Sequence, residues 1–172
     1  MKVYFAADHA GFALKNTLVE FVRTLGYEAE DCGASTLDTS DDYPPIIIRA
    51  AEKVAHDLKN DVVSRAIVLG ASGQGEAMVA NRIKGIRAAV FYGTPLRLQK
   101  DLSEHILDIL TSSRMHNNDN VLSLGARFLN EEEAKDAVKK WLSAAFGGEE
   151  RHTRRIKQID DLTTQAGPMN HD

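Results

Sequence analysis

A short apolar run leads directly into a glycine-rich loop near the middle of the chain. Residues 65–69 (RAIVL) are followed by 70–75 (GASGQG), and a short helix is predicted over 76–83. Apolar runs of this length are typical of strands that are covered on both faces, as in parallel sheets. The strand–loop–helix order therefore indicates an α/β protein.

The same alternation continues on both sides of this segment. Proline is tolerated in a first helical turn, so Pro44 and Pro45 can open a helix, and Asn130 is a helix cap. Together the five strands predict a parallel sheet with helices on both faces, joined by right-handed crossovers. The other strands are predicted at 3–7, 27–31, 86–92 and 121–125, and the other helices at 12–25, 43–60, 95–112 and 131–146.

Composition limits the classes of protein that remain. The chain has 172 residues, 43% of them hydrophobic and 27% charged, which fits one globular domain. A net charge of −4 predicts no nucleic-acid partner. A single cysteine, Cys32, excludes an internal disulfide and a thiolate zinc cluster. No run approaches the roughly 20 apolar residues that cross a bilayer, so we expect no membrane association and a cytoplasmic location.

The chain changes character after Gly148. We expect an α/β domain over 1–148 and a helical arm over 149–162 that contributes arginines. A disordered tail is expected over 163–172. Arg151 and Arg155 are four residues apart, so a helix places both guanidinium groups on one face, where they suit an anion or simply form a solvated basic face.

The loop that ends at Glu76 has two possible meanings. Ser72, Gly73 and Gly75 let backbone amides approach a ligand, and the following helix favours negative charge at its N-terminus. A carboxylate at position 76 does not suit a phosphate cradle, but it suits a proton carrier; alternatively, it simply stabilises the first helical turn. Met78 replaces the third glycine of a dinucleotide fingerprint, so we expect no nucleotide cofactor.

Two polar clusters are candidates to face this loop. Asp8-His9 ends the first strand, and His116-Asn117-Asn118 precedes the strand at 121–125. Ligands of parallel sheets bind beyond the carboxyl ends of the strands, so we expect the site at Asp8-His9, at 70–76 and near 116–120. The alternative for Asp8-His9 is a turn-forming aspartate beside a surface histidine.

Several short segments occur in one order between residue 2 and about residue 160. They are 7–12 (ADHAGF), 42–44 (DYP), Gly73-x-Gly75, 80–82 (ANR), 85–88 (GIRA), His116-Asn117, 124–127 (LGAR) and Arg151-His152-x-x-Arg155. This set resembles the type B ribose-5-phosphate isomerases and their galactose- and allose-6-phosphate relatives. The resemblance implies a three-layer Rossmann-like fold with a five-stranded sheet. It also implies a homodimer, which could pair into a tetramer, with active sites shared across the interface.

The resemblance also implies metal-free, cofactor-free interconversion of an aldose and a ketose phosphate through a cis-enediolate. One branch of the family uses a cysteine base at the position matched by Gly70, and another uses a glutamate, matched by Glu76. Ser72 and the amides around Gly73 and Gly75 would then stabilise the enediolate oxygens.

The resemblance also implies roles for the other matched residues. They would assist ring opening (His116, Asp8), contact the enediolate from the partner subunit (Asn117) or hold the phosphate (His9, Arg127, Arg151, Arg155).

One departure bears on the substrate. The segment between Ala88 and His116 is longer than in short family members, and the extra length, within 93–115, could extend a lid or change which sugar fits. We therefore expect an isomerase of ribose 5-phosphate and ribulose 5-phosphate. Isomerisation of allose or galactose 6-phosphate is the alternative. A non-catalytic sugar-phosphate sensor is a third reading, but it would gain nothing from Glu76.

Overall fold

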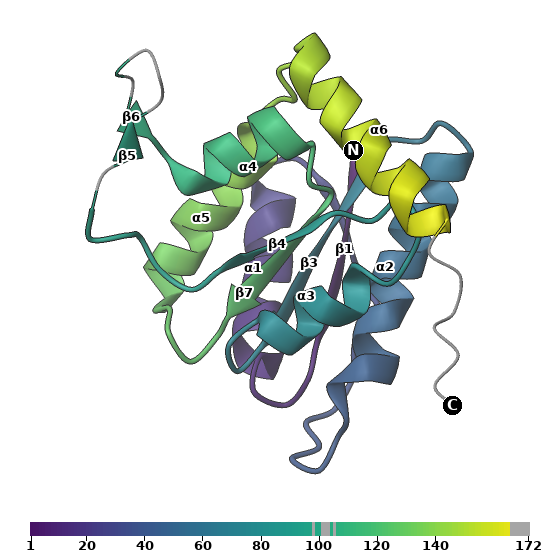
Figure 1. Ribbon diagram of the computed structural model, residues 1–172. Coiled ribbons are helices and arrows are strands. Elements are labelled where there is room, and N and C mark those ends of the chain that lie inside the picture. The colour runs from purple at the N-terminus through teal and green to yellow at the C-terminus, as the bar shows by residue number, and fades with distance from the viewer. Residues whose placement is uncertain (98, 101–103, 105, 166–172) are drawn as a thin grey trace, which may run out of the picture.

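The structure, a computed structural model, describes residues 1–97, 99–100, 104 and 106–165. Its centre is a five-stranded parallel sheet in the order β2-β1-β3-β7-β4 (Figure 1). The predicted parallel sheet is thus confirmed, with the strand that precedes the glycine loop at its centre. The strands are β1 (Lys2–Ala7), β2 (Glu28–Asp31), β3 (Ser64–Gly70), β4 (Ala88–Phe91) and β7 (Val121–Gly125).

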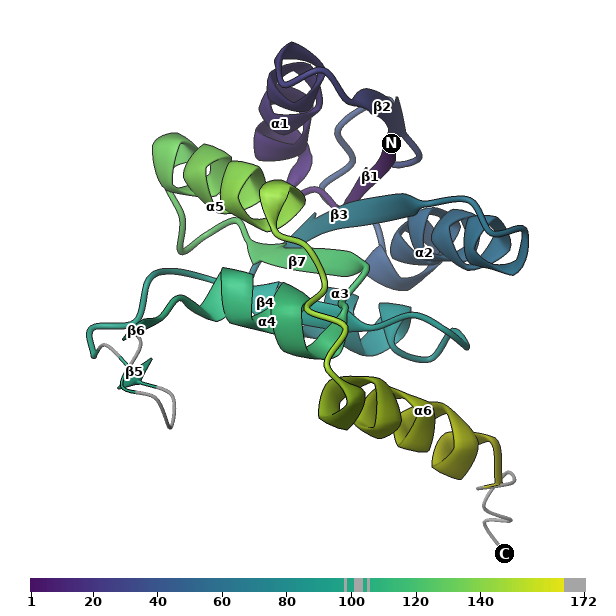
Figure 2. The ribbon, with the colours of Figure 1, turned by 90° about the horizontal axis from the view of Figure 1, so that it is seen from above.

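Helices cover both faces of the sheet, which confirms the three-layer, Rossmann-like fold (Figure 2). The face covered by α1 (Phe12–Thr24) and α5 (Glu131–Ser143) is opposite to the one covered by α2 (Tyr43–Lys59) and α3 (Gln74–Ala80). Two further helices, α4 (Ile109–Asn117) and α6 (Glu150–Gln165), lie beside this body. Among the described residues, no helix is long and apolar enough to cross a membrane.

The alternation of side chains along the strands builds the two cores. In β1, Phe5 faces α1 and α5, whereas Tyr4 faces α2. In β3, Leu69 faces the side of α1 and α5, and Val68 faces the side of α2. Every residue of β3 is buried. A strand whose centre is buried on both faces needs apolar side chains on each of them, which is why residues 66–69 form a continuous apolar run.

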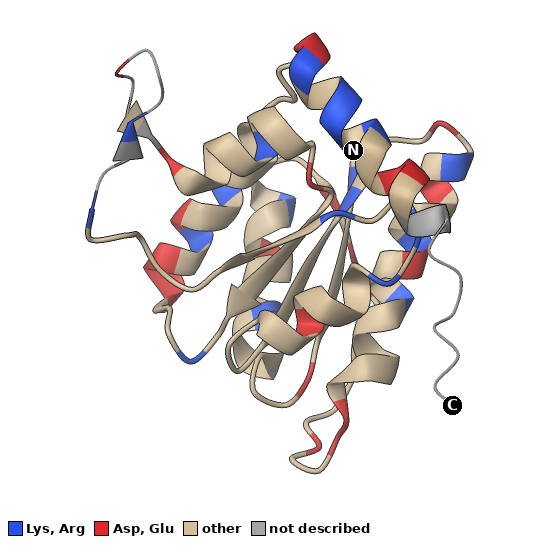
Figure 3. Cartoon of the chain, viewed as in Figure 1, with Lys and Arg blue, Asp and Glu red and all other residues tan. Residues whose placement is uncertain are grey.

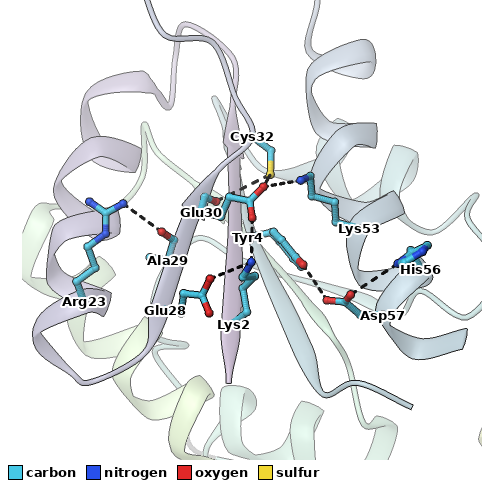
Figure 4. Close-up of polar contacts among 10 residues, drawn as sticks. All are labelled: Lys2, Tyr4, Arg23, Glu28, Ala29, Glu30, Cys32, Lys53, His56 and Asp57. Carbon is cyan, nitrogen blue, oxygen red and sulfur yellow. Dashed lines mark hydrogen bonds and ion pairs between the residues drawn. The ribbon is translucent and has the colours of Figure 1, made fainter. Parts of the chain in front are cut away.

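Charged side chains protect the exposed edge of β2 (Figure 4). Glu30 pairs with Lys53 of α2, and with Lys2 of β1 at 3.2 Å. Lys2 also lies 2.9 Å from Glu28. These charges oppose pairing of the edge strand with another chain.

The predicted helix caps are present. The Asn130 side chain accepts a hydrogen bond from the Glu133 amide, and the Glu133 carboxylate accepts one from the Asn130 amide, both at 2.9 Å. This reciprocal capping box starts α5 at the predicted residue. Pro44 and Pro45 lie in the first turn of α2, as expected.

The prediction of one helix over 95–112 is wrong. The segment contains a small antiparallel pair, β5 (Gln99–Lys100) and β6 (Ile106–Leu107), and α4 begins only at Ile109. The Asp108 side chain accepts hydrogen bonds from the amides of the second and third helical residues, both at 3.1 Å. A capping aspartate ends the preceding segment, because its own backbone is extended rather than helical.

The predicted arm after residue 148 is helical. α6 runs from Glu150 to Gln165, three residues beyond the predicted limit, and projects away from the sheet in Figure 2. Of the tail predicted over 163–172, residues 166–172 lie outside the described part of the chain.

A buried polar cluster joins α5 to the segment before β7. The Trp141 indole nitrogen donates to an Asp119 carboxylate oxygen at 2.7 Å. The Arg65 guanidinium donates to the backbone carbonyls of Trp141 and Leu142, both at 2.9 Å. The cluster satisfies the last carbonyls of α5, at the point where the chain leaves for α6.

Replacing Trp141 with phenylalanine should destabilise the protein by about 2–4 kcal/mol, because it leaves a cavity and removes the donor from a buried carboxylate. Urea unfolding followed by circular dichroism measures this change. The control is Phe128→Leu at a ring that is 62% exposed, where a change within about 0.5 kcal/mol is expected. Equal effects of the two substitutions would contradict this role of Trp141.

Candidate active site

The loops that follow β1, β3 and β7 meet at the carboxyl edge of the sheet. The amide of Ala126 donates to the Gly70 carbonyl at 2.8 Å, and the amide of Arg127 donates to the Ala71 carbonyl at 3.1 Å. The turn after β7 is therefore hydrogen-bonded to the glycine loop after β3. This edge also receives Asp8 and His9, as predicted from strand direction.

The Glu76 carboxylate lies directly against the Cα of Gly70. A Cβ added at Gly70 would lie 1.9 Å from Glu76 Oε1 and 2.2 Å from its Cδ, a distance that no real side chain tolerates. The carboxylate thus fills the space that any other side chain at position 70 would need. The space beside Gly70 is therefore occupied by a glutamate from the first turn of α3 and not by a side chain of the strand.

Glu76 is only 4% exposed, and burial raises the pKa of its carboxyl. The nearby charge of Asp8 adds to this increase. A raised pKa brings a carboxyl closer to the pH at which it can both accept and release a proton. The structure therefore favours the proton-carrier reading of Glu76 over that of a solvated acid in the first helical turn.

Backbone conformation and close packing explain the small residues of the loop. Gly73 has a φ of +77°, and its carbonyl accepts a hydrogen bond from the Ser123 hydroxyl at 2.6 Å. A Cβ at Gly75 would lie 2.7 Å from the hydroxyl oxygen of Tyr43, so the phenol covers this glycine. The Ser72 hydroxyl accepts from the Gln74 amide at 3.4 Å.

Asp8 and His9 are both held by hydrogen bonds. Asp8 Oδ1 accepts from the amides of Ala10 and Gly11, at 3.0 and 3.2 Å. His9 Nδ1 lies 2.7 Å from Asp41 Oδ1, and this carboxylate raises the pKa of the imidazole. Asp8, His9 and Asp41 place three possible metal-ligand atoms within 4.8 Å of one another, although His9 and Asp41 already bond to each other.

The second set of predicted residues lies on α4 and α6. The His116 ring stacks on that of His152, with centroids 4.4 Å apart and planes 11° apart. His152 is buried, and burial, followed by the neighbouring His116 and Arg151, lowers its pKa. Arg151 and Arg155 are exposed on either side of His152, and Figure 3 shows basic residues along the first half of α6.

The expectation that residues 116–120 lie at the carboxyl edge is wrong for a single chain. Val121 is in register with Ala66, and Gly125 with Gly70, so the residues before β7 enter at the amino edge. Four residue steps of strand separate the two edges by about 13 Å. His116, Asn117, Arg151 and Arg155 therefore do not meet Glu76 within one chain.

Sequence reasoning assigned no role to three residues of these clusters. Asp41 directly precedes the matched 42–44 segment, Tyr43 lies within it, and His152 lies between the matched arginines. Their positions beside matched segments were a signal, but only tertiary contacts show that they touch His9, Gly75 and His116.

The chain is an α/β protein of the sugar isomerase class. It matches the Ribose/Galactose Isomerase family over residues 3–96 and 105–159 and belongs to that family. It is 35% identical to ribose-5-phosphate isomerase B of Mycobacterium tuberculosis over 98% of this chain and 95% of that one.

Solved structures show the same likeness. Ribose-5-phosphate isomerase B of Mycoplasma genitalium, solved with bound ribulose-5-phosphate, has a TM-score of 0.80 and 31% identity, covering 95% of this chain and 97% of that chain. The Clostridium thermocellum ribose-5-phosphate isomerase B also gives 0.80, with 32% identity and coverage of 97% and 100%.

The family match is interrupted at 97–104, inside the segment predicted to be longer. This interruption contains β5 and ends just before β6, and the β5–β6 pair projects from the body in Figure 1. The pair precedes the first turn of α4, whereas His116 lies in its last turn. In Figures 1 and 2 the described β5–β6 pair lies apart from α3, whose first turn carries Glu76.

The buried Glu76 carboxylate should lower stability as the pH rises. Its folded-state pKa is above the ordinary value, so the folded state binds the proton more tightly than the unfolded state. Below the ordinary glutamate pKa, Glu76→Gln and the wild type should have the same free energy of unfolding. As the pH rises through the raised pKa of Glu76, the variant should become the more stable protein. Urea unfolding between about pH 4 and pH 8 tests this. Exposed Glu132→Gln is the control, and a pH-independent difference for Glu76→Gln would contradict the assignment.

Proposed function

We propose that this protein interconverts ribose 5-phosphate and ribulose 5-phosphate. The observation that carries the proposal is the buried Glu76 carboxylate lying on Gly70, inside a loop of small residues. The family and the ribulose-5-phosphate-bound relative support the choice of substrate. We also propose that the protein acts in pentose phosphate metabolism in the cytoplasm, where such phosphorylated sugars are metabolised.

Glu76 would carry the proton. In the open-chain aldose, its carboxylate removes the proton from C2 while the C1 carbonyl oxygen gains negative charge, which gives a cis-enediolate. The carboxyl then returns the proton to C1, the hydroxyl proton on the C2 oxygen passes to the C1 oxygen, and the C2 oxygen becomes the ketone carbonyl. Ser72 and the amides around Gly73 and Gly75 would stabilise the enediolate oxygens, and the step needs neither metal nor cofactor.

The remaining residues would prepare and hold the substrate. Asp8 and His116 would assist ring opening, and Asn117 would contact the enediolate. Binding of the phosphate, remote from the reacting carbons, supplies free energy for positioning them. We assign the phosphate to His9, Arg127, Arg151 and Arg155.

These residues act together only if two chains combine. The Glu76 set lies at the carboxyl edge and the His116 set at the amino edge, about 13 Å apart along the strands. We propose a homodimer in which the carboxyl edge of each chain faces the amino edge and the 149–162 arm of its partner. A two-fold axis then completes two equivalent sites.

Glu76→Gln should lower kcat for ribose 5-phosphate by about 10²–10⁴-fold, because it removes the group that transfers the proton. KM should stay within a few-fold, since the phosphate contacts are elsewhere. Steady-state assays of ribulose 5-phosphate formation measure both constants, with allose and galactose 6-phosphate as comparison substrates. A near-normal kcat would overturn the assignment, and Glu132→Gln controls for the loss of a negative charge.

A mixed dimer tests whether the sites are shared. Glu76→Gln disables the carboxyl-edge set, and replacing both Arg151 and Arg155 with alanine disables the amino-edge set. Heterodimers of the two variants, purified through two different tags, should recover about half of the wild-type activity, because one of their two sites is intact. Heterodimers as inactive as both parent homodimers would show that the site is not shared in this way.

A further inference from the structure

The segment that leads from β2 to α2 crosses the carboxyl edge and ends beside His9. One oxygen of Asp41, Oδ1, bonds to His9 twice: to the backbone amide at 3.1 Å and to ring Nδ1 at 2.7 Å. The Asp41 side chain is only 11% exposed, while that of His9 is 31% exposed. Both the position and the ring orientation of His9 thus depend on one carboxylate.

The segment is held at both ends. At its start, the fully buried Lys15 pairs with Asp31 and donates to the Ala34 carbonyl at 3.3 Å. Near its end, Asp38 Oδ1 accepts hydrogen bonds from the amide and the hydroxyl of Ser40, at 2.9 and 2.6 Å. The carbonyl of Asp38 also accepts from the Asp41 amide at 3.3 Å. These contacts keep Asp41 in place.

We propose that Asp41 is a positioning residue that makes His9 a phosphate ligand: it holds Nδ1, so that Nε2 is left to donate to the anion. The inference deepens the proposed function and rests on it. A neutral imidazole that donates from Nδ1 to a carboxylate has only a lone pair on Nε2, which repels a phosphate oxygen. In this arrangement, phosphate binding through His9 requires the doubly protonated ring.

The charges around His9 favour that doubly protonated form. Asp41 makes the largest contribution, and the carboxylate of Asp8 acts in the same direction. Asp38 also interacts with His9 electrostatically, while its own hydrogen bonds go to Ser40. Arg127 and burial act in the opposite direction, and the net result is a raised pKa. Phosphate affinity should therefore be high below this raised pKa and fall as the pH rises through it.

Asp41→Asn tests the charge separately from the geometry, because the asparagine oxygen can still accept from Nδ1 and from the amide. At about pH 8 we expect this variant to bind inorganic phosphate about tenfold more weakly than the wild type, measured by calorimetry. KM for ribose 5-phosphate should rise by a similar factor with kcat unchanged. Toward about pH 6 the two proteins should converge, because an unperturbed imidazole is also protonated there.

Asp38→Asn is the matched control, since it removes a neighbouring charge from the same segment without removing a His9 contact. Equal losses for the two variants, unchanged phosphate affinity in Asp41→Asn, or a loss confined to kcat would each overturn the inference. So would wild-type protein that binds no phosphate. Phosphate binding and the His9 ring titration followed by NMR need no turnover. A missing isomerase activity would therefore contradict the proposed function without obscuring this result.

Discussion

The parallel pairing of β3 with β1 and β7 is the constraint on which the rest of the structure depends. Because the three strands run in the same direction, every segment that follows a strand lies at one edge and every segment that precedes one lies at the other. Asp8 and Glu76 come together for this reason, and His116 is separated from them for the same reason. The distance is set by strand length, so no side-chain movement within one chain closes it.

Within the carboxyl edge, the proposed proton transfer depends on the contact between Glu76 and Gly70. The glycine provides the space, and the short helix α3 returns the carboxylate to the end of the strand. Burial raises the pKa of this carboxyl, so keeping it charged costs stability. The loop before α2 adds the carboxylate of Asp41, whose hydrogen-bond partner is the imidazole of His9.

The errors of prediction have identifiable physical causes. The charged, amphipathic pattern over 95–112 suggested a helix, but Asp108 caps α4 and separates it from the residues before it. Residues 116–120 were expected at the carboxyl edge, where ligands of parallel sheets bind, although they precede a strand and enter at the opposite edge. The contacts of Asp41 with His9 and of His152 with His116 join segments that are far apart in the chain, so no local pattern reports them.

The sequence by itself determined the α/β class, the five strands, the cap at Asn130 and the loop that carries Glu76. These features follow from local periodicity, backbone preferences and short motifs, which a chain contains before it folds. Only the tertiary structure decided that the Glu76 carboxylate fills the side-chain space at Gly70 and that Asp41 holds His9. It also decided that the predicted residues divide between two edges. Those outcomes depend on strand direction and on packing between distant segments, which local sequence does not encode.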